Sequence, residues 1–166
     1  NMLKLLLAGF QGVGKTTTGR LLAEKLELPF FDTDDMLTAL HNKPVRQLYQ
    51  ELVEERFREE EAKLLAELKS KDMKSVVALG GGTLLSPKAQ ELAPSLGSLV
   101  YLYSSPEVLM QKLKPASFLD PKDPYGAFKA IFAKRHPLFC RLCTYRIDVD
   151  GMSAEEVAHT ILDFYG

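Results

Sequence analysis

Residues 9–16 read GFQGVGKT and directly follow the apolar run MLKLLLA. They fit the pattern G-x-x-x-x-G-K-[ST], in which glycines let successive backbone N–H groups curl around a phosphate. The lysine reaches the β- and γ-phosphates, and the hydroxyl ligates Mg²⁺. A glycine-rich turn with an incidental lysine is the alternative. The position between a strand candidate and a helix candidate favours the phosphate site.

A nucleoside triphosphate and Mg²⁺ are therefore the predicted ligands of this loop. The residues expected to contact the nucleotide are Gly12, Val13, Gly14, Lys15, Thr16 and Thr17. Thr16 is the first candidate metal ligand.

Three acids follow a short apolar stretch, in the sequence DTDD at 32–35. Asp32 lies close enough to the end of a predicted strand to help hold Mg²⁺ or its waters. Asp34 is placed to take a proton from the hydroxyl of a phosphate acceptor. The alternative role is capping of the helix that begins with DMLTAL, because carboxylates are favoured at helix N-termini. We assign that capping role to Asp35.

Gly80, Gly81 and Gly82 end the apolar stretch SVVAL, where bare backbone N–H groups can bind an anion or a hydroxyl. A flexible strand-to-helix turn is the alternative. Arg58 lies in a charged helix candidate, where pairing at i+3 or i+4 is the default. Arg135 lies in the segment AKRHPLF. The planar fork of an arginine suits a carboxylate.

The two cysteines, Cys140 and Cys143, are spaced C-x-x-C. No second cysteine pair and no histidine spacing completes a zinc site. A thioredoxin-like redox motif would stand near the start of a helix, whereas this pair lies late in the helix candidate FKAIFAKRHPLFCRLC. We therefore predict small buried side chains.

Apolar strand candidates alternate with amphipathic helix candidates along the chain, which predicts a parallel sheet covered on both faces. The predicted strands span 3–8, 29–32, 75–80, 98–103 and 145–149. The predicted helices span 14–28, 35–40, 45–70, 105–114, 128–143 and 153–166. Ser104 or Ser105 is expected to cap the helix at 105–114, and Ser153 with Glu156 forms a capping box at the last helix. Ligands of such folds bind at the carboxyl ends of the strands.

The 166 residues, with a net charge of −1, fit one domain at 1–166. No basic patch argues for nucleic acid, no run of about 18 apolar residues spans a membrane, and no signal peptide is visible. We expect a cytoplasmic protein. The proline-rich segment at 114–124, KPASFLDPKDP, has the length of a lid loop.

The ordered set GVGKTT, DTDD, FR followed by acids, GGG and RHPLF resembles shikimate kinase over nearly the whole chain. Many proteins share the first motif, but the ordered set is specific. The resemblance implies transfer of the γ-phosphate of ATP to the 3-hydroxyl of shikimate, on the route to chorismate and the aromatic amino acids. It also implies a P-loop three-layer αβα fold with a five-stranded parallel sheet, a lid at 114–124 and a helical substrate-binding region at 33–62.

The resemblance also implies roles for individual residues. Asp34 matches the acid that binds the shikimate hydroxyls and is the candidate base, while Asp32 matches the acid near Mg²⁺. The residues implied to bind the substrate are Asp34, Arg58, Gly80, Gly81, Gly82 and Arg135, with both arginines on the carboxylate. Lys15, Asp32 and Asp34 are the implied catalytic residues. Members of the family are commonly monomers, so we expect a monomer whose partner is a small molecule.

The chain departs from the family in its lid, where an arginine that reaches the ATP phosphates usually precedes a Pro-Leu-Leu-like run. Residues 114–124 contain no arginine. Lys114 or Lys122 is the candidate replacement, and Lys114 is assigned to ATP. A lysine supplies a point charge rather than a planar fork.

Three other classes of protein are alternatives. A kinase for another small acceptor, such as gluconate or a nucleoside monophosphate, would share the phosphate loop but not the set Asp34, Arg58 and Arg135. A catalytically weak or silent nucleotide-binding module of the same fold is favoured only by the lid without an arginine. A regulatory GTPase is disfavoured, because the sequence contains no guanine-reading N-K-x-D motif.

Overall fold

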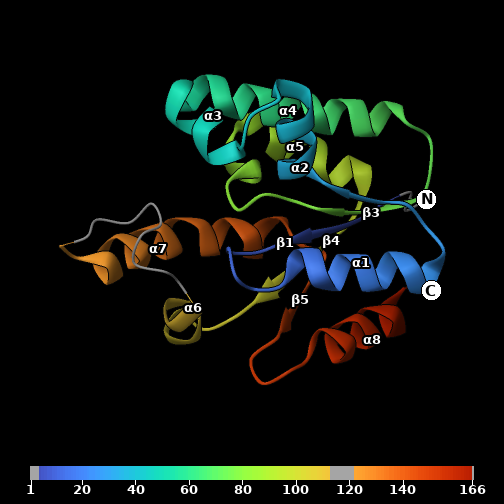
Figure 1. The fold of residues 1–166 in the computed structure, drawn as a ribbon. Coiled ribbons are helices and arrows are strands. Elements are labelled where there is room, and N and C mark those ends of the chain that lie inside the picture. Colours follow the sequence, from blue (N-terminus) through green and yellow to red (C-terminus); the bar gives the residue numbers. More distant parts are fainter. Residues whose placement is uncertain (1–3, 113–121, 166) are drawn as a thin grey trace.

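The computed structural model describes residues 4–112 and 122–165, and its centre is a sheet of five parallel strands (Figure 1). The strands are β1 (Lys4–Ala8), β2 (Phe30–Asp32), β3 (Ser75–Ala78), β4 (Gly97–Tyr103) and β5 (Tyr145–Asp148). Their order across the sheet is β2-β3-β1-β4-β5. The predicted α/β fold with five parallel strands is confirmed.

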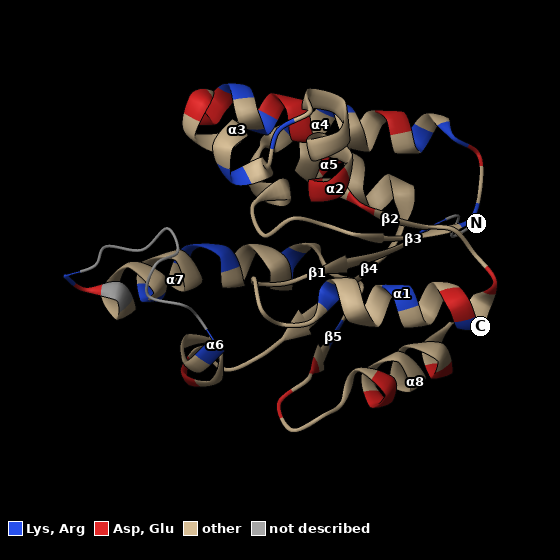
Figure 2. Cartoon of the chain, viewed as in Figure 1, with Lys and Arg blue, Asp and Glu red and all other residues tan. Residues whose placement is uncertain are grey.

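Helices cover both faces of this sheet, so the molecule has three layers. In Figure 1, α1 and α8 lie on one side of the strands, and α4 and α5 lie on the other. The helices are α1 (Lys15–Leu26), α2 (Thr33–His41), α3 (Val45–Glu51), α4 (Glu54–Ser70), α5 (Pro87–Leu96), α6 (Pro106–Lys112), α7 (Pro124–Leu142) and α8 (Ala154–Phe164). A 3₁₀ helix, η1 (Thr83–Leu85), follows β3. Charged residues of both signs are spread along α3 and α4 (Figure 2).

The strands form because their apolar side chains are buried on both faces, as parallel sheets require. All five residues of β1 are buried. Register places the carboxyl ends of three strands together: Leu7 pairs with Ala78, and Ala78 pairs with Asp32. The loops that follow β1, β2 and β3 therefore leave the sheet at one edge, where ligands of such folds bind.

The predicted single helix at 45–70 is wrong, because two helices occupy this segment. Leu52 and Val53 have extended backbones, with ψ of 148° and 150°, and separate α3 from α4. The break lets Leu48 of α3 and Phe57 of α4 pack with Leu37 in a small cluster of buried side chains. The predicted substrate-binding region at 33–62 comprises α2, α3 and the first half of α4.

Two further expectations differ from the structure. Helix α5 is not among the predicted helices; it begins with Pro87 in the tolerated first turn and is capped by the Ser86 side chain. The prediction of small buried cysteines is wrong for Cys140, which is exposed, while Cys143 is half-buried.

The capping box at Ser153 and Glu156 is confirmed: the Ser153 hydroxyl accepts from Glu156 N–H, and the Glu156 carboxylate accepts from Ser153 N–H. At α6 the choice between two serines is resolved in favour of Ser105, whose hydroxyl accepts from Val108 N–H at 3.4 Å. In the part of the chain that the structure describes, no helix combines the length and the apolar character needed to cross a membrane.

We expect Leu65→Ala to lower the free energy of unfolding by about 2–5 kcal/mol, because it removes a fully buried side chain and leaves a cavity. Leu65 lies in α4 and is 0% exposed. The matched control is Leu40→Ala in α2, where the side chain is 61% exposed, and its effect should stay within about 0.5 kcal/mol. Urea unfolding measures both, and equal losses would contradict the described packing.

Candidate active site

The phosphate-binding loop, residues 9–16, is built around glycines in left-handed conformations. Gly12 and Gly14 have φ of 90° and 95°, which residues with a side chain rarely adopt. The N–H of Val13 donates to the carbonyl oxygen of Phe10 at 3.2 Å and closes the turn. Gly14 is the N-cap of α1 and offers no side chain to its first turn. The N–H groups of that turn and the helix dipole are thus left for an oxyanion.

Lys15 extends from the first turn of α1 across this loop. Its Nζ donates to the carbonyl oxygens of Gly9 at 2.5 Å and Phe10 at 3.3 Å. Burial lowers the pKa of Lys15 to about 8, while the negative charges of Asp34 and Asp32 oppose that decrease. An incoming phosphate would supply a stronger anionic partner than two carbonyl oxygens and would raise this pKa again.

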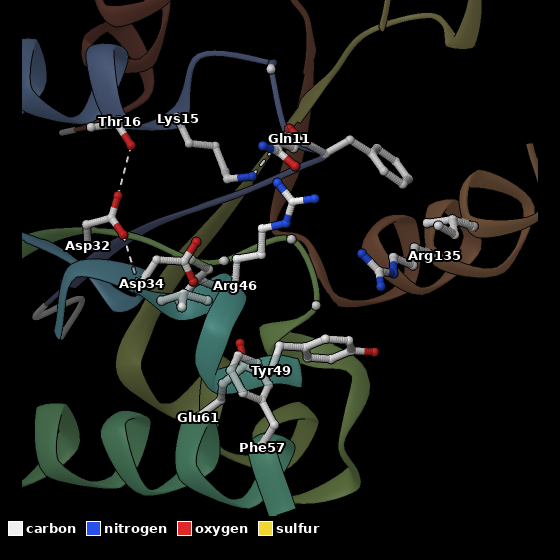
Figure 3. A pocket seen from close by; sticks show the side chains of 18 of the residues that line it. Gln11, Lys15, Thr16, Asp32, Asp34, Arg46, Tyr49, Phe57, Glu61 and Arg135 are labelled. Atoms are coloured by element: carbon white, nitrogen blue, oxygen red, sulfur yellow. Dashed lines mark hydrogen bonds between the residues drawn. The ribbon is translucent and has the colours of Figure 1, made fainter. Parts of the chain in front are cut away.

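Thr16 and Asp32 bring two oxygen atoms together between α1 and β2 (Figure 3). The Thr16 hydroxyl donates to Asp32 Oδ2 at 2.8 Å, while Asp32 Oδ1 accepts from the N–H groups of Asp34 and Asp35. Asp32 is therefore the N-cap of α2, since it has the extended backbone of that position. The prediction that Asp35 caps this helix is wrong. Hydroxyl and carboxylate oxygens are the hard donors that Mg²⁺ prefers, so this pair fits the predicted metal.

Asp34 lies on the first turn of α2, beside the loop that follows β3. A Cβ built on Gly80 would lie 2.6 Å from Asp34 Oδ1, so glycine is required for this approach. Burial raises the pKa of Asp34 to about 6; the charges of Asp32 and Glu61 add to the increase, and Lys15 opposes it. A carboxylate with a pKa closer to neutrality is suited to accept a proton from an alcohol.

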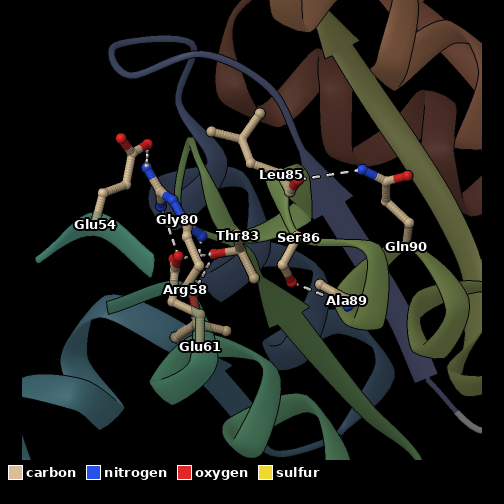
Figure 4. A network of polar contacts seen from close by, with 10 residues as sticks. Glu54, Arg58, Glu61, Gly80, Thr83, Leu85, Ser86, Ala89 and Gln90 are labelled. Atoms are coloured by element: carbon tan, nitrogen blue, oxygen red, sulfur yellow. Dashed lines mark hydrogen bonds and ion pairs between the residues drawn. The ribbon is translucent and has the colours of Figure 1, made fainter. Parts of the chain in front are cut away.

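Arg58, on α4, is held in a buried polar network next to the same loop (Figure 4). Its NH1 donates to Glu61 Oε1 at 2.6 Å, and Glu61 Oε2 accepts from the Thr83 hydroxyl at 2.7 Å. Glu61 is 1% exposed and Thr83 is 0% exposed. The guanidinium also lies near the rings of Tyr49 and Phe57. These contacts fix the guanidinium in place before any ligand arrives.

Arg135, on α7, approaches the same glycines. A Cβ built on Gly81 would lie 3.6 Å from Arg135 NH1, and one built on Gly82 would lie 2.4 Å from Arg58 NH1. Burial lowers the pKa of Arg135, and the positive charge of Arg58 lowers it further. An anion bound by both guanidiniums would relieve this repulsion. We call Arg58, Arg135 and Gly80–Gly82 the arginine cradle, and its chemistry suits a carboxylate.

All of these groups line one cleft of about 780 Å³. Among the predicted residues, those in its lining are Gly12, Gly14, Lys15, Thr16, Thr17, Asp32, Asp34, Arg58, Gly80, Gly81, Gly82 and Arg135. Residues of the lining that the sequence analysis missed include Phe10, Gln11, Val45, Arg46, Tyr49, Phe57, Glu61, Phe128 and Ile131. The i,i+3 spacing of Arg58 and Glu61 could have revealed Glu61. Phe57 carried no signal of a site, because it reads as an apolar position of the charged helix.

Val13 and Lys114 are the remaining residues predicted to contact the nucleotide. The side chain of Val13 is 8% exposed and packs in the core, which leaves its backbone for the nucleotide. Lys114 lies outside the described residues, and Lys122 is exposed. Lys112, which the sequence analysis did not single out, donates to the carbonyl oxygen of Gly12 at 3.5 Å and connects α6 to the phosphate-binding loop.

Sequence comparisons with known proteins agree on one family. The model of the family described as shikimate kinase matches residues 11–165. The chain is 34% identical over 161 residues to the shikimate kinase of Cupriavidus pinatubonensis strain JMP 134, with 95% of this chain and 83% of that protein covered. It is also 34% identical over 166 residues to the shikimate kinase of Symbiobacterium thermophilum, with 97% and 95% covered.

Solved structures give the same result. Shikimate kinase from Acinetobacter baumannii in complex with shikimate has a TM-score of 0.90 and 29% identity, over 99% of this chain and 93% of that one. A gluconokinase from Sinorhizobium meliloti has a TM-score of 0.59 and 19% identity, over 96% and 89%. At that identity the second likeness shows the fold alone.

We expect the pKa of Asp34 to be about 6 in the ligand-free protein and to fall in Asp32→Asn, because the variant removes a neighbouring negative charge. Asparagine still caps a helix, so α2 should remain intact. Carbon-13 NMR titration of the aspartate carboxyl groups measures both values. Asp163→Asn in α8 is the control and should leave this pKa unchanged. A pKa of Asp34 at or below the ordinary aspartate value would contradict the described burial.

Proposed function

This chain belongs to the shikimate kinase family, and we propose that it transfers the γ-phosphate of ATP to the 3-hydroxyl of shikimate, giving shikimate 3-phosphate and ADP. The family match over residues 11–165 supports this function. The observation that carries it is the arrangement of the cleft: the arginine cradle and the phosphate-binding loop line one cavity, with Asp34 adjacent to both.

The cleft offers separate partners for the two ends of a hydroxylated ring acid. The arginine cradle takes the carboxylate, and Asp34 takes a hydroxyl. Gly80 lies against Asp34, whereas Gly81 and Gly82 lie against the two arginines, so the loop after β3 runs from the hydroxyl end to the carboxylate end. An acid bound in this direction presents its hydroxyl toward Lys15.

In the proposed reaction, Asp34 accepts the proton of the 3-hydroxyl while the hydroxyl oxygen forms a bond to the γ-phosphorus. The bond from that phosphorus to the β,γ-bridging oxygen breaks, and ADP leaves with the bonding electrons. Lys15 stabilises negative charge on the β- and γ-phosphates. Because Asp34 must be ionised, kcat/KM for shikimate should decline as the pH falls below about 6.

Thr16 and Asp32 would hold Mg²⁺, with the hydroxyl as a direct ligand and the carboxylate orienting that hydroxyl or a bound water. When bound, the metal neutralises charge on the phosphate oxygens. We also propose that the protein acts on this small molecule as a monomer.

The test of this function is ADP release from Mg·ATP in the presence of shikimate, gluconate, a nucleoside monophosphate or no acceptor. We expect release above background with shikimate alone. Lys15→Met should abolish turnover without unfolding the protein, because it removes the charge on the β- and γ-phosphates. Lys25→Met on the same helix, outside the cleft lining, is the matched control. Equal release with gluconate, or without any acceptor, would contradict the proposal.

A second variant tests the arginine cradle. Arg135→Gln should raise KM for shikimate about 10- to 100-fold and leave KM for ATP nearly unchanged, because a charged hydrogen bond to the carboxylate contributes about 1.5–3 kcal/mol. Lys134→Gln, at the exposed neighbouring position, should change neither constant. An effect of Arg135→Gln confined to ATP would remove this arginine from the acceptor site.

A further inference from the structure

We propose that Arg46, on the first turn of α3, is a further catalytic residue that binds the phosphoryl group during its transfer. The proposal rests on the proposed function, because it concerns the same reaction. Arg46 belongs to the lining of the cleft. Figure 3 shows its side chain pointing toward Gln11 and Lys15 of the phosphate-binding loop, away from Glu61 and the rings below it.

Four cationic side chains line the cleft within the described residues: Lys15, Arg46, Arg58 and Arg135. Arg58 and Arg135 both lie against the glycines after β3, at the end of the cleft assigned to the carboxylate. Lys15 comes from the nucleotide side. Arg46 is the cation that comes from the acceptor side and points toward the nucleotide loop, so its position corresponds to the gap that the phosphoryl group must cross.

Two acidic side chains also hold the Arg58 guanidinium in place. Glu61 Oε1 lies 2.6 Å from Arg58 NH1, and Glu54 Oε1 lies 3.7 Å from NH2. Turning this guanidinium toward the nucleotide would leave the carboxylate of Glu61 buried without its charged partner, which is strongly unfavourable. Arg58 is therefore held at the carboxylate end of the cleft, whereas Arg46 points toward the phosphate-binding loop (Figure 3).

The backbone that carries Arg46 is anchored. Leu48, two residues further along α3, is 3% exposed and packs with Leu37, Phe57 and Leu64. The side chain of Arg46 is itself exposed and long, so it can adjust to a ligand while its helix stays in place. A long side chain on an anchored helix suits contact with a group that moves between two substrates.

The chemistry calls for such a residue. In phosphoryl transfer, negative charge is spread over three equatorial oxygens, and an arginine in contact with them increases kcat by a factor of about 10³–10⁵ in other phosphoryl-transfer enzymes. The planar fork can bind two of these oxygens at once, whereas a lysine binds one. The proline-rich segment at 114–124 contains no arginine in its sequence.

The first experiment compares Arg46→Ala and Arg46→Lys with the wild-type enzyme, whose shikimate-dependent turnover must be established first. We expect Arg46→Ala to lower kcat at least about 100-fold, with KM for shikimate and for ATP within about threefold. Arg46→Lys should recover only a small part of the rate. Arg56→Ala, at an exposed arginine of α4 outside the cleft lining, is the matched control and should keep normal kcat.

The second experiment measures binding by calorimetry, which separates a catalytic role from a structural one. Arg46→Ala should weaken the complex of Mg·ADP, aluminium fluoride and shikimate, which mimics the group in transit, at least about 100-fold. Binding of shikimate alone and of Mg·ADP alone should remain within about threefold. A kcat within twofold of wild type, or an equal loss in all three binding measurements, would overturn the proposal. An inactive wild-type enzyme would instead overturn the proposed function.

Discussion

The buried carboxylate of Glu61 is the interaction on which the geometry of the site depends. The N–H of Gly80 donates to the Thr33 hydroxyl at 2.8 Å, and the Thr33 and Thr83 hydroxyl oxygens lie 3.4 Å apart. The Thr83 hydroxyl donates a hydrogen bond to Glu61, which also accepts one from Arg58. One charge on α4 thus connects α2, η1 and the loop after β3. Separating these elements would leave a buried charge without partners, at a cost of about 3–5 kcal/mol.

These contacts keep two clusters of charged side chains apart within a single cleft. Asp32 and Asp34 lie beside Lys15, where burial and mutual repulsion raise the pKa of Asp34 and burial lowers that of Lys15. Arg58 and Arg135 lie at the glycines, where burial and then the repulsion between the two guanidiniums lower the pKa of Arg135. Each cluster is strained by its own like charges or by burial, and each is relieved by a ligand of defined chemistry. The site is thus prepared for its ligands before they bind.

Local sequence patterns predicted the features that are built from residues close together in the chain. The phosphate-binding loop and its flanking strand and helix are of this kind, and so is the capping box at Ser153. Roles set by tertiary contacts were not predictable in the same way. Asp32 rather than Asp35 caps α2, because the strand ends with Asp32 in an extended conformation. Glu61 reads as one more surface acid of a charged helix until Thr83 is placed beside it.

The wrong helix boundary at 45–70 and the missed role of Arg46 have the same physical origin. The alternation of charged and apolar residues through this segment predicts one long helix, whereas the structure divides it into α3 and α4. With the extended residues Leu52 and Val53 in between, Leu48 can reach the cluster around Leu37 while Phe57 enters the same cluster from α4. That contact anchors α3, whose first residues, Val45 and Arg46, line the cleft. A continuous helix would carry Arg46 along the axis of α4, so the small satellite core is what gives the acceptor side of the cleft its phosphate-facing arginine.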